Sequence, residues 1–411
     1  MVIRRSITVK SILIALSVQT ALCFWGVVLM VSPPLCRLSI AIAQELREPL
    51  LPTGDLPPRG NPGRTLLSGE VLAAAEDHTD LRLSAAGTTD DSGASILTPA
   101  APGLQSILSH CWSREQLSGK SETPEKIRSQ AVHTSSPPTR PDPLCHPAPL
   151  PSDRQGSLRS VEIPADKGKP VALTFDLCES GGKVSGYEAD LVNILRDNRV
   201  PATFFAGGKW MQSHPEETMQ LMADQLFEIG NHSWSHAHFS QLDGTQMERE
   251  ILWTQAQYEI LRERLLTRKC VQEAGQLEMD KVPPIPLLFR FPYGTCTPAA
   301  LRTVNQLGLA AIQWSIVTGD AAPSQTAGGI VRIVRQQIKP GAIIIGHANG
   351  RGHGIVAALK ELIPELRQSG YAFVTVSQLL ALGNPIDANS CYENKPNDNR
   401  HYDRRRSRQI P

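Results

Sequence analysis

The sequence lacks an excess of charge of either sign. Its 411 residues include 41 Lys and Arg against 40 Asp and Glu, which gives a formal net charge of +1. This balance argues against nucleic acid as a partner, because binding a phosphate backbone needs a concentrated positive surface. What the chain does contain is a hydrophobic fraction of 41%, which is enough for a sizeable core.

Two common motifs are also missing. No Gly-x-Gly-x-x-Gly follows the first strand-like run at 171–176, so the usual dinucleotide-binding fold is not expected. None of the eight cysteines shows the close paired spacing of a structural zinc site. Two cysteines lie in or near the N-terminal apolar segment, and the other six are free to form disulfides in an oxidising compartment. Their connectivity does not follow from the sequence.

The N-terminus reads as an export signal. Basic residues precede an apolar run at 11–31, and small residues at 41–43 offer a cleavage site. Residues 1–43 are therefore expected to be either a cleaved signal peptide or an uncleaved membrane anchor. A lipobox is missing, because Leu22 stands before Cys23 where a small residue is needed. In both cases the body of the protein is exported, and we expect it to be periplasmic, on the cell surface or secreted.

Composition divides the exported part into three. Residues 44–163 are rich in Pro, Ser and Gly and are expected to be a mostly disordered linker, although 104–117 has enough apolar character to dock on the main domain. Residues 164–383 form the predicted catalytic domain. Residues 384–411 are polar and are expected to be a tail.

Strands and helices alternate through the predicted domain. Apolar runs predict strands, and amphipathic stretches between them predict helices. This alternation favours a distorted (β/α)7–8 barrel over an open doubly wound sheet. The predicted strands are 171–176, 202–206, 228–231, 287–291, 310–317, 342–346 and 372–376, and the predicted helices are 187–198, 210–225, 244–266, 298–306, 326–337 and 355–368.

Two histidines follow the predicted strand 228–231. His232 and His236 are four residues apart, and one helical turn would bring both rings to the same side, where they can bind one divalent ion. We therefore expect them to be metal ligands. His214, His238 and His353 are expected to be structural.

Two further strands end in groups suited to proton transfer. Asp176 follows an apolar run, and a carboxylate there can take a proton from water whose acidity a metal has raised. His347 ends the strand 342–346 and can protonate an amine leaving group. The pair predicts hydrolysis by a general base and a general acid.

The residues that support this pair are expected at or just beyond the ends of two other strands. A guanidinium at Arg290 near Asp176 would keep the carboxylate ionised, and Asp320 is expected to pair with Arg290 and hold its fork in place. Tyr293, in the turn Pro292-Tyr293-Gly294, can offer its backbone N–H to a developing oxyanion.

Taken together, these segments resemble the polysaccharide deacetylases, carbohydrate esterase family 4, which share the nodulation chitooligosaccharide deacetylase homology domain. Residues 174–176 resemble the family's first motif, Thr-Phe-Asp-Asp-Gly, and residues 231–236 its second, His-Ser/Thr-x-x-His. Residues 290–294, Asp320 and residues 345–347 resemble the third, fourth and fifth motifs. The five occur in the family's order, and the resemblance covers 169–382, about half of the chain.

The resemblance implies metal-dependent removal of acetyl groups from an N-acetylated glycan: peptidoglycan, a chitin-like oligomer or an exopolysaccharide. It implies that Asp176 is the base, that His347 is the acid, and that Arg290 and Asp320 support them. It also implies a divalent ion on His232 and His236, for which we expect Zn²⁺. The sequence leaves the oligomeric state open.

The chain departs from the family pattern at two positions. Leu177 stands where the family has a second Asp, the third metal ligand, so Cys178, Glu179 or Asp176 itself would have to complete the site. Ala321 follows Asp320 where the family usually has Trp. These departures leave two alternatives open, a glycan-binding pseudoenzyme with an incomplete metal site and an O-ester deacetylase.

Overall fold

The computed structural model describes residues 106–123, 127, 136–152, 155–179 and 185–398. The predicted signal or anchor at 1–43, much of the predicted linker and the basic end of the chain lie outside these residues. Within the described part, no helix has both the length and the apolar character needed to cross a membrane.

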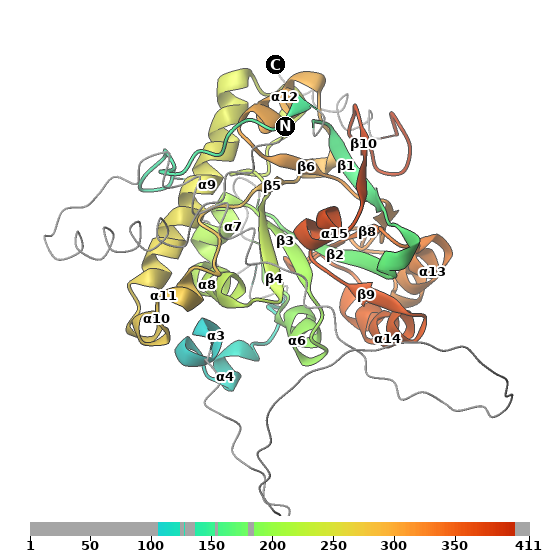
Figure 1. Cartoon of the computed structure of the whole chain (residues 1–411), viewed down its shortest axis with the longest axis horizontal. Helices are drawn as coiled ribbons and strands as arrows, with labels where there is room; N and C mark the ends of the chain where they lie inside the picture. The colour runs from blue at the N-terminus through green and yellow to red at the C-terminus, as the bar shows by residue number, and fades with distance from the viewer. Residues whose placement is uncertain (1–105, 124–126, 128–135, 153–154, 180–184, 399–411) are drawn as a thin grey trace, which may run out of the picture. The chain divides into compact units, whose positions relative to one another are not determined.

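A curled sheet of ten strands forms the centre of the fold (Figure 1). The strand order is β10-β1-β6-β5-β4-β3-β2-β8-β7, with β9 paired to β2 as well. All strand pairs are parallel except β1 with β10. The strands are β1 (Ser157–Glu162), β2 (Lys169–Leu177), β3 (Ala202–Ala206), β4 (Phe227–Asn231), β5 (Leu288–Phe289), β6 (Ala310–Ile312), β7 (Ile316–Val317), β8 (Ile343–His347), β9 (Tyr371–Phe373) and β10 (Asn384–Ala388).

Helices surround the central strands (Figure 1). Most of them connect one parallel strand to the next, as the alternating sequence pattern requires. They are α3 (Ile107–Cys111), α4 (Arg114–Leu117), α6 (Ala189–Asp197), α7 (Gly208–Ser213), α8 (Pro215–Ala223), α9 (Gly244–Leu266), α10 (Lys269–Ala274), α11 (Gln276–Met279), α12 (Pro298–Gln306), α13 (Ala327–Gln337), α14 (Ile355–Gln368) and α15 (Val376–Ala381). The distorted barrel of strands and helices that the sequence predicts is confirmed.

The details of several elements differ from the prediction. The helix expected over 210–225 is two helices, because Pro215 cannot donate a backbone hydrogen bond and begins α8 instead of continuing α7. The strand expected over 310–317 is also two, β6 and β7, and these stand far apart in the strand order. The strand expected over 372–376 ends at Phe373, and α15 follows it.

Strand β1 links the two sides of the curled sheet. Its first residues pair in parallel with β6, and the Gln313 N–H donates to the Leu158 carbonyl at 2.7 Å. Further along, Ser160 bridges to Ala342, which directly precedes β8. Because β1 pairs with β10 as well, residues outside the predicted limits of 164 and 383 belong to the sheet. We therefore propose that the folded domain extends beyond both limits.

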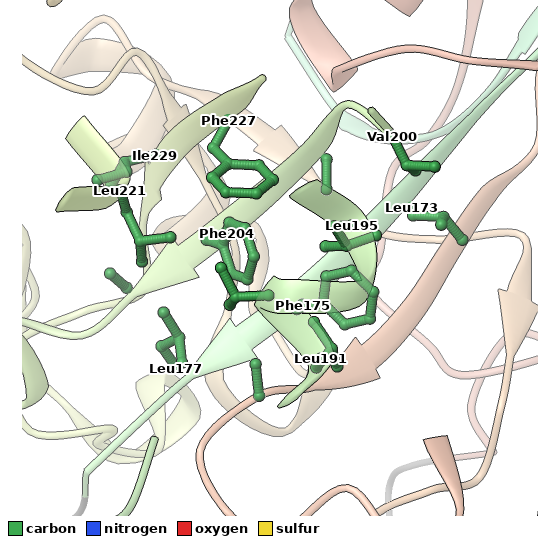
Figure 2. Close-up of a cluster of buried hydrophobic side chains, with 14 of the residues drawn as sticks. Leu173, Phe175, Leu177, Leu191, Leu195, Val200, Phe204, Leu221, Phe227 and Ile229 are labelled. Carbon is green, nitrogen blue, oxygen red and sulfur yellow. The ribbon is translucent and has the colours of Figure 1, made fainter. Parts of the chain in front are cut away.

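Alternation along the strands separates two apolar regions. On β2, Leu173, Phe175 and Leu177 face the helices and pack with residues of α6 and α8 (Figure 2). The residues between them face the other way, toward the barrel interior, where Phe205 of β3 and Ile345 of β8 are buried. The strand ends on that interior side carry the polar groups of the site.

The segment before β1 is fastened to the domain. Cys111 of α3 forms a disulfide with Cys270 of α10. A second disulfide, which does not involve this segment, joins Cys296 and Cys391. The Trp112 indole N–H donates to Glu216 at 2.6 Å, and its ring lies 5.1 Å from the guanidinium carbon of Arg268. The docking expected for 104–117 is therefore present in the described part of that segment.

The Cys111–Cys270 disulfide spans 159 positions of sequence and should stabilise the fold by restricting the unfolded chain. We expect the C111S/C270S variant to lose about 2–4 kcal/mol of unfolding free energy. Urea denaturation under oxidising conditions measures the loss, with Lys120→Ala, an exposed change in the same segment, as the control. Equal denaturation midpoints for the double variant and the wild type would contradict the prediction.

Candidate active site

Asp176 and His347 lie side by side at the end of the sheet where the parallel strands finish. They occupy the last paired positions of the β2–β8 ladder. Side chains alternate between the two faces of a strand, and both residues are at positions whose side chains face the interior. The parallel register thus brings a carboxylate and an imidazole together from 171 positions apart in sequence.

Arg290 holds Asp176. Its Nη1 donates to Asp176 Oδ1 at 2.9 Å, while its other nitrogens donate to the backbone carbonyls of Ile312 and Gln313. The guanidinium is fully buried, with its central carbon 3.9 Å from the ring centroid of Phe205. Burial alone would raise the pKa of Asp176, but interactions with its neighbours, His232 and the Arg290 guanidinium foremost, hold that pKa below its usual range.

Asp320 holds His347 and not Arg290, so the predicted Arg290–Asp320 pair is wrong. Asp320 Oδ1 accepts from His347 Nδ1 at 2.9 Å, and its Oδ2 accepts from the His347 backbone N–H at 2.7 Å. The reason lies in the strand order, because β7, which precedes Asp320, is the neighbour of β8 and not of β5. Burial lowers the pKa of His347, but the hydrogen bond with Asp320 and its charge outweigh that effect and raise it.

His232 and His236 come together after β4, with ring centroids 5.0 Å apart. They do so without the helical turn that their spacing predicted. Residues 232–238 form a loop in which Ser233 and His236 have positive φ angles of 65° and 53°. Left-handed backbone is costly for residues with a Cβ and is retained where the surroundings impose it.

Two residues that the sequence analysis did not single out hold this loop. Asn231 Oδ1 accepts from the Ser233 N–H at 2.9 Å, and Glu250 of α9 accepts from the N–H and the hydroxyl of Ser235 at 2.8 and 2.7 Å. An Asn before a turn is a recognised turn signal, so Asn231 was within reach of sequence analysis. Glu250 was not, because its contact depends on how α9 packs.

The donor set fits a divalent ion. His232 Nδ1 donates to the Arg290 carbonyl at 2.8 Å, which leaves Nε2 with its lone pair. That nitrogen is buried 3.5 Å from Asp176 Oδ2 and has no hydrogen-bond partner among the described residues. Burial lowers the pKa of both His232 and His236, which keeps the rings in the neutral form that binds metals. Ligand-type atoms of Cys178, His232 and His236 lie within 4.8 Å of one another.

Tyr293 lies beside the imidazoles in the turn after β5. Its φ of 60° is left-handed, and its ring centroid is 4.5 Å from that of His236 and 5.2 Å from that of His238. The structure therefore places all seven residues predicted for the site, namely Asp176, His232, His236, Arg290, Tyr293, Asp320 and His347, in two connected groups around the barrel mouth. Trp210 and Trp314 are buried, as core residues are.

Comparison with known proteins identifies the family of this chain. The family model described as polysaccharide deacetylase matches residues 164–271. A peptidoglycan-N-acetylglucosamine deacetylase of Bacillus cereus is 32% identical over 224 residues, which are 53% of this chain and 91% of that protein. A chitooligosaccharide deacetylase of Bradyrhizobium sp. is 30% identical over 225 residues, 51% of this chain and 90% of that protein.

Among solved structures, the peptidoglycan deacetylase PdaC from Bacillus subtilis is 28% identical, with a TM-score of 0.41 over 52% of this chain and 91% of that one. The sequence matches carry the assignment, because they span nearly the whole length of the curated relatives. The chain belongs to the polysaccharide deacetylase family.

Proposed function

We propose that the protein is an exported, metal-dependent deacetylase that hydrolyses the acetamide group of an N-acetylated glycan. The observation that carries the proposal is the pairing of Asp176 with His347 at adjacent strand ends, each on its own buried ionic partner, with Asp176 beside the imidazole pair. A purely binding surface has no need for a base and an acid whose pKa values are pushed apart.

In the proposed reaction each side chain has one task. A divalent ion held by His232 and His236 would supply Lewis acidity, which acidifies water and polarises an amide carbonyl. Asp176, kept ionised by Arg290, takes the proton from the attacking water. His347 donates a proton to the departing amine through Nε2, because Nδ1 is bonded to Asp320. The backbone N–H of Tyr293 faces the developing oxyanion.

The metal we propose is zinc. Neutral imidazoles are nitrogen ligands of the kind that zinc prefers, and a site with three protein ligands and an open position is the usual arrangement for hydrolysis. The fully buried Nε2 of His232 supports this proposal.

The substrate we propose is a polymer of N-acetylglucosamine, such as peptidoglycan or a chitin-like chain. The relatives named above act on peptidoglycan N-acetylglucosamine and on chitooligosaccharide. Export is supported by the N-terminal sequence pattern and by the disulfides at Cys111–Cys270 and Cys296–Cys391, which need an oxidising compartment.

The first test is acetate release. We expect zinc-loaded protein to release acetate from chitooligosaccharides or peptidoglycan fragments, and a chelator to stop the release. Asp176→Asn and His347→Gln should each lower kcat by roughly 10²–10⁴-fold, because each removes one proton transfer. Asp166→Asn, an exposed carboxylate away from the site, is the matched control and should leave kcat unchanged. Metal-loaded protein that releases no acetate from any of these glycans would favour a binding role.

The second test concerns pH. Asp320 raises the pKa of His347, so replacing its charge should lower that pKa. Because His347 acts as an acid, the rate falls as pH rises through its pKa, and Asp320→Asn should therefore move the alkaline limb of kcat/KM to lower pH. The pH profile of the variant beside those of the wild type and Asp166→Asn measures the shift. An alkaline limb that stays in place would remove His347 from the role of acid.

A further inference from the structure

Leu177 stands where the family pattern has a second Asp as the third metal ligand, and its side chain cannot bind a metal in this chain. Leu177 is the last residue of β2, and its backbone pairs with Ala206 of β3. Extended backbone turns successive side chains to opposite faces, so Leu177 faces away from Asp176 and lies in the core among Phe204 and Leu191 (Figure 2). It is fully buried there and has no polar atom to offer.

The same alternation returns the next residue to the site. Cys178 follows Leu177, and its sulfur lies within 4.8 Å of the ligand nitrogens of His232 and His236. This separation is close to twice the Zn–S bond length of about 2.3 Å, so the three atoms can converge on one ion. Of the cysteines that the structure describes, Cys178 alone has a free thiol, because the others are held in disulfides.

Glu179, another candidate for third ligand, is directed elsewhere. Its Oε2 accepts from the Ser185 N–H at 3.1 Å and from the Ser213 hydroxyl at 2.9 Å. The group of metal-ligand atoms found in the described residues accordingly includes Cys178 and leaves out Glu179. These two hydrogen bonds orient the carboxylate toward Ser185 and Ser213.

A buried amide holds the cysteine in place. Asn349, two residues beyond His347, donates from Nδ2 to the Cys178 carbonyl at 2.8 Å and to its sulfur at 3.1 Å. The side chain of Asn349 is fully buried, so this contact is shielded from water. Hydrogen bonds of this kind orient a ligand and stabilise negative charge on it, as outer contacts do around metal sites generally.

We propose that Cys178 is the third protein ligand, so that the ion is held by one sulfur and two imidazole nitrogens. The proposal deepens the proposed function, since it concerns the same metal, and it identifies a site different from the carboxylate site of relatives. A thiolate is a soft ligand and favours zinc over oxygen-preferring ions such as Mg²⁺ or Mn²⁺. The chain would then have exchanged a hard ligand for a soft one while keeping one negative charge on the ion.

Cobalt substitution tests the proposal without any catalytic assay. Full-length protein is stripped of metal and titrated with Co²⁺, whose complexes with thiolates have an intense charge-transfer absorption in the near ultraviolet. We expect this absorption in the wild type and in Glu179→Gln, and we expect its loss in Cys178→Ser. Zinc affinity, measured by competition with a chelating dye, should fall by at least about 100-fold in Cys178→Ser and by about 10–100-fold in Asn349→Ala, which removes only the outer contact.

The wild-type spectrum alone can overturn the proposal, so the test does not depend on whether a variant folds. A cobalt complex with no sulfur charge-transfer band would show that Cys178 is not a ligand. Loss of zinc affinity in Glu179→Gln with none in Cys178→Ser would do the same. Acetate release from a protein that lacks the band would leave the proposed function standing without this ligand. The band in a protein that releases no acetate would uphold the ligand and overturn the function.

Discussion

The buried ion pair between Arg290 and Asp176 is the interaction on which the rest of the site depends. Both side chains are almost completely withdrawn from water, and the guanidinium is enclosed by Phe205, Trp314 and two backbone carbonyls. The desolvation of two such charges cancels much of their attraction, so the pair adds little net stability, yet losing one partner typically costs about 3–5 kcal/mol. Its value is that Asp176 stays ionised next to a metal site.

Asp320 has the opposite effect on His347, because it raises the pKa of that side chain. Positive charge nearby lowers the pKa of the Asp176 carboxyl, and the Asp320 carboxylate raises the pKa of His347. Burial alone would shift each pKa in the opposite direction. The two supports come from opposite directions, since Arg290 follows β5 and reaches Asp176 across the interior, while Asp320 follows β7 beside β8. The base and the acid that we propose can therefore lie on neighbouring strands and keep different pKa values.

Local pattern was enough to predict most elements. The helices 244–266, 298–306 and 355–368 begin and end where the sequence predicted, and local signals mark their ends: Asp243 caps the first, Pro298 begins the second and Ser369 ends the third. Strands β1 and β10 were missed, since they are fixed by pairing over more than 200 positions and carry no local signal of their own. The break between β6 and β7 was missed because the two pair with different strands, β6 with β1 and β5 and β7 with β8, and the local sequence does not show this.

The site, like the fold, was predictable where local sequence decides and not where the arrangement of strands decides. Strand ends predicted which residues gather at the mouth of the barrel, because parallel strands finish on one face. The ion pairs between these residues were not predictable, because the strands are not arranged in the sheet in the order in which they occur in the sequence. The Arg290–Asp320 error arose there, and so did the helical explanation for His232 and His236, whose meeting depends on left-handed residues held by Asn231 and Glu250.

The length of strand β2 explains why the ligand we propose is Cys178 and not residue 177. Hydrogen bonding between β2 and β3 continues to Leu177, as the Gly207 N–H donates to the Leu177 carbonyl at 2.9 Å, and residue 177 is thereby committed to the core. If pairing ended one residue earlier, the backbone could turn and direct residue 177 to the site. With the strand extended, residue 177 lies in the core, which suits an apolar side chain, and Cys178 is the next residue that lies close to the imidazoles. In the proposed coordination the two positions are linked, because the extended strand directs Leu177 to the core and Cys178 to the imidazoles.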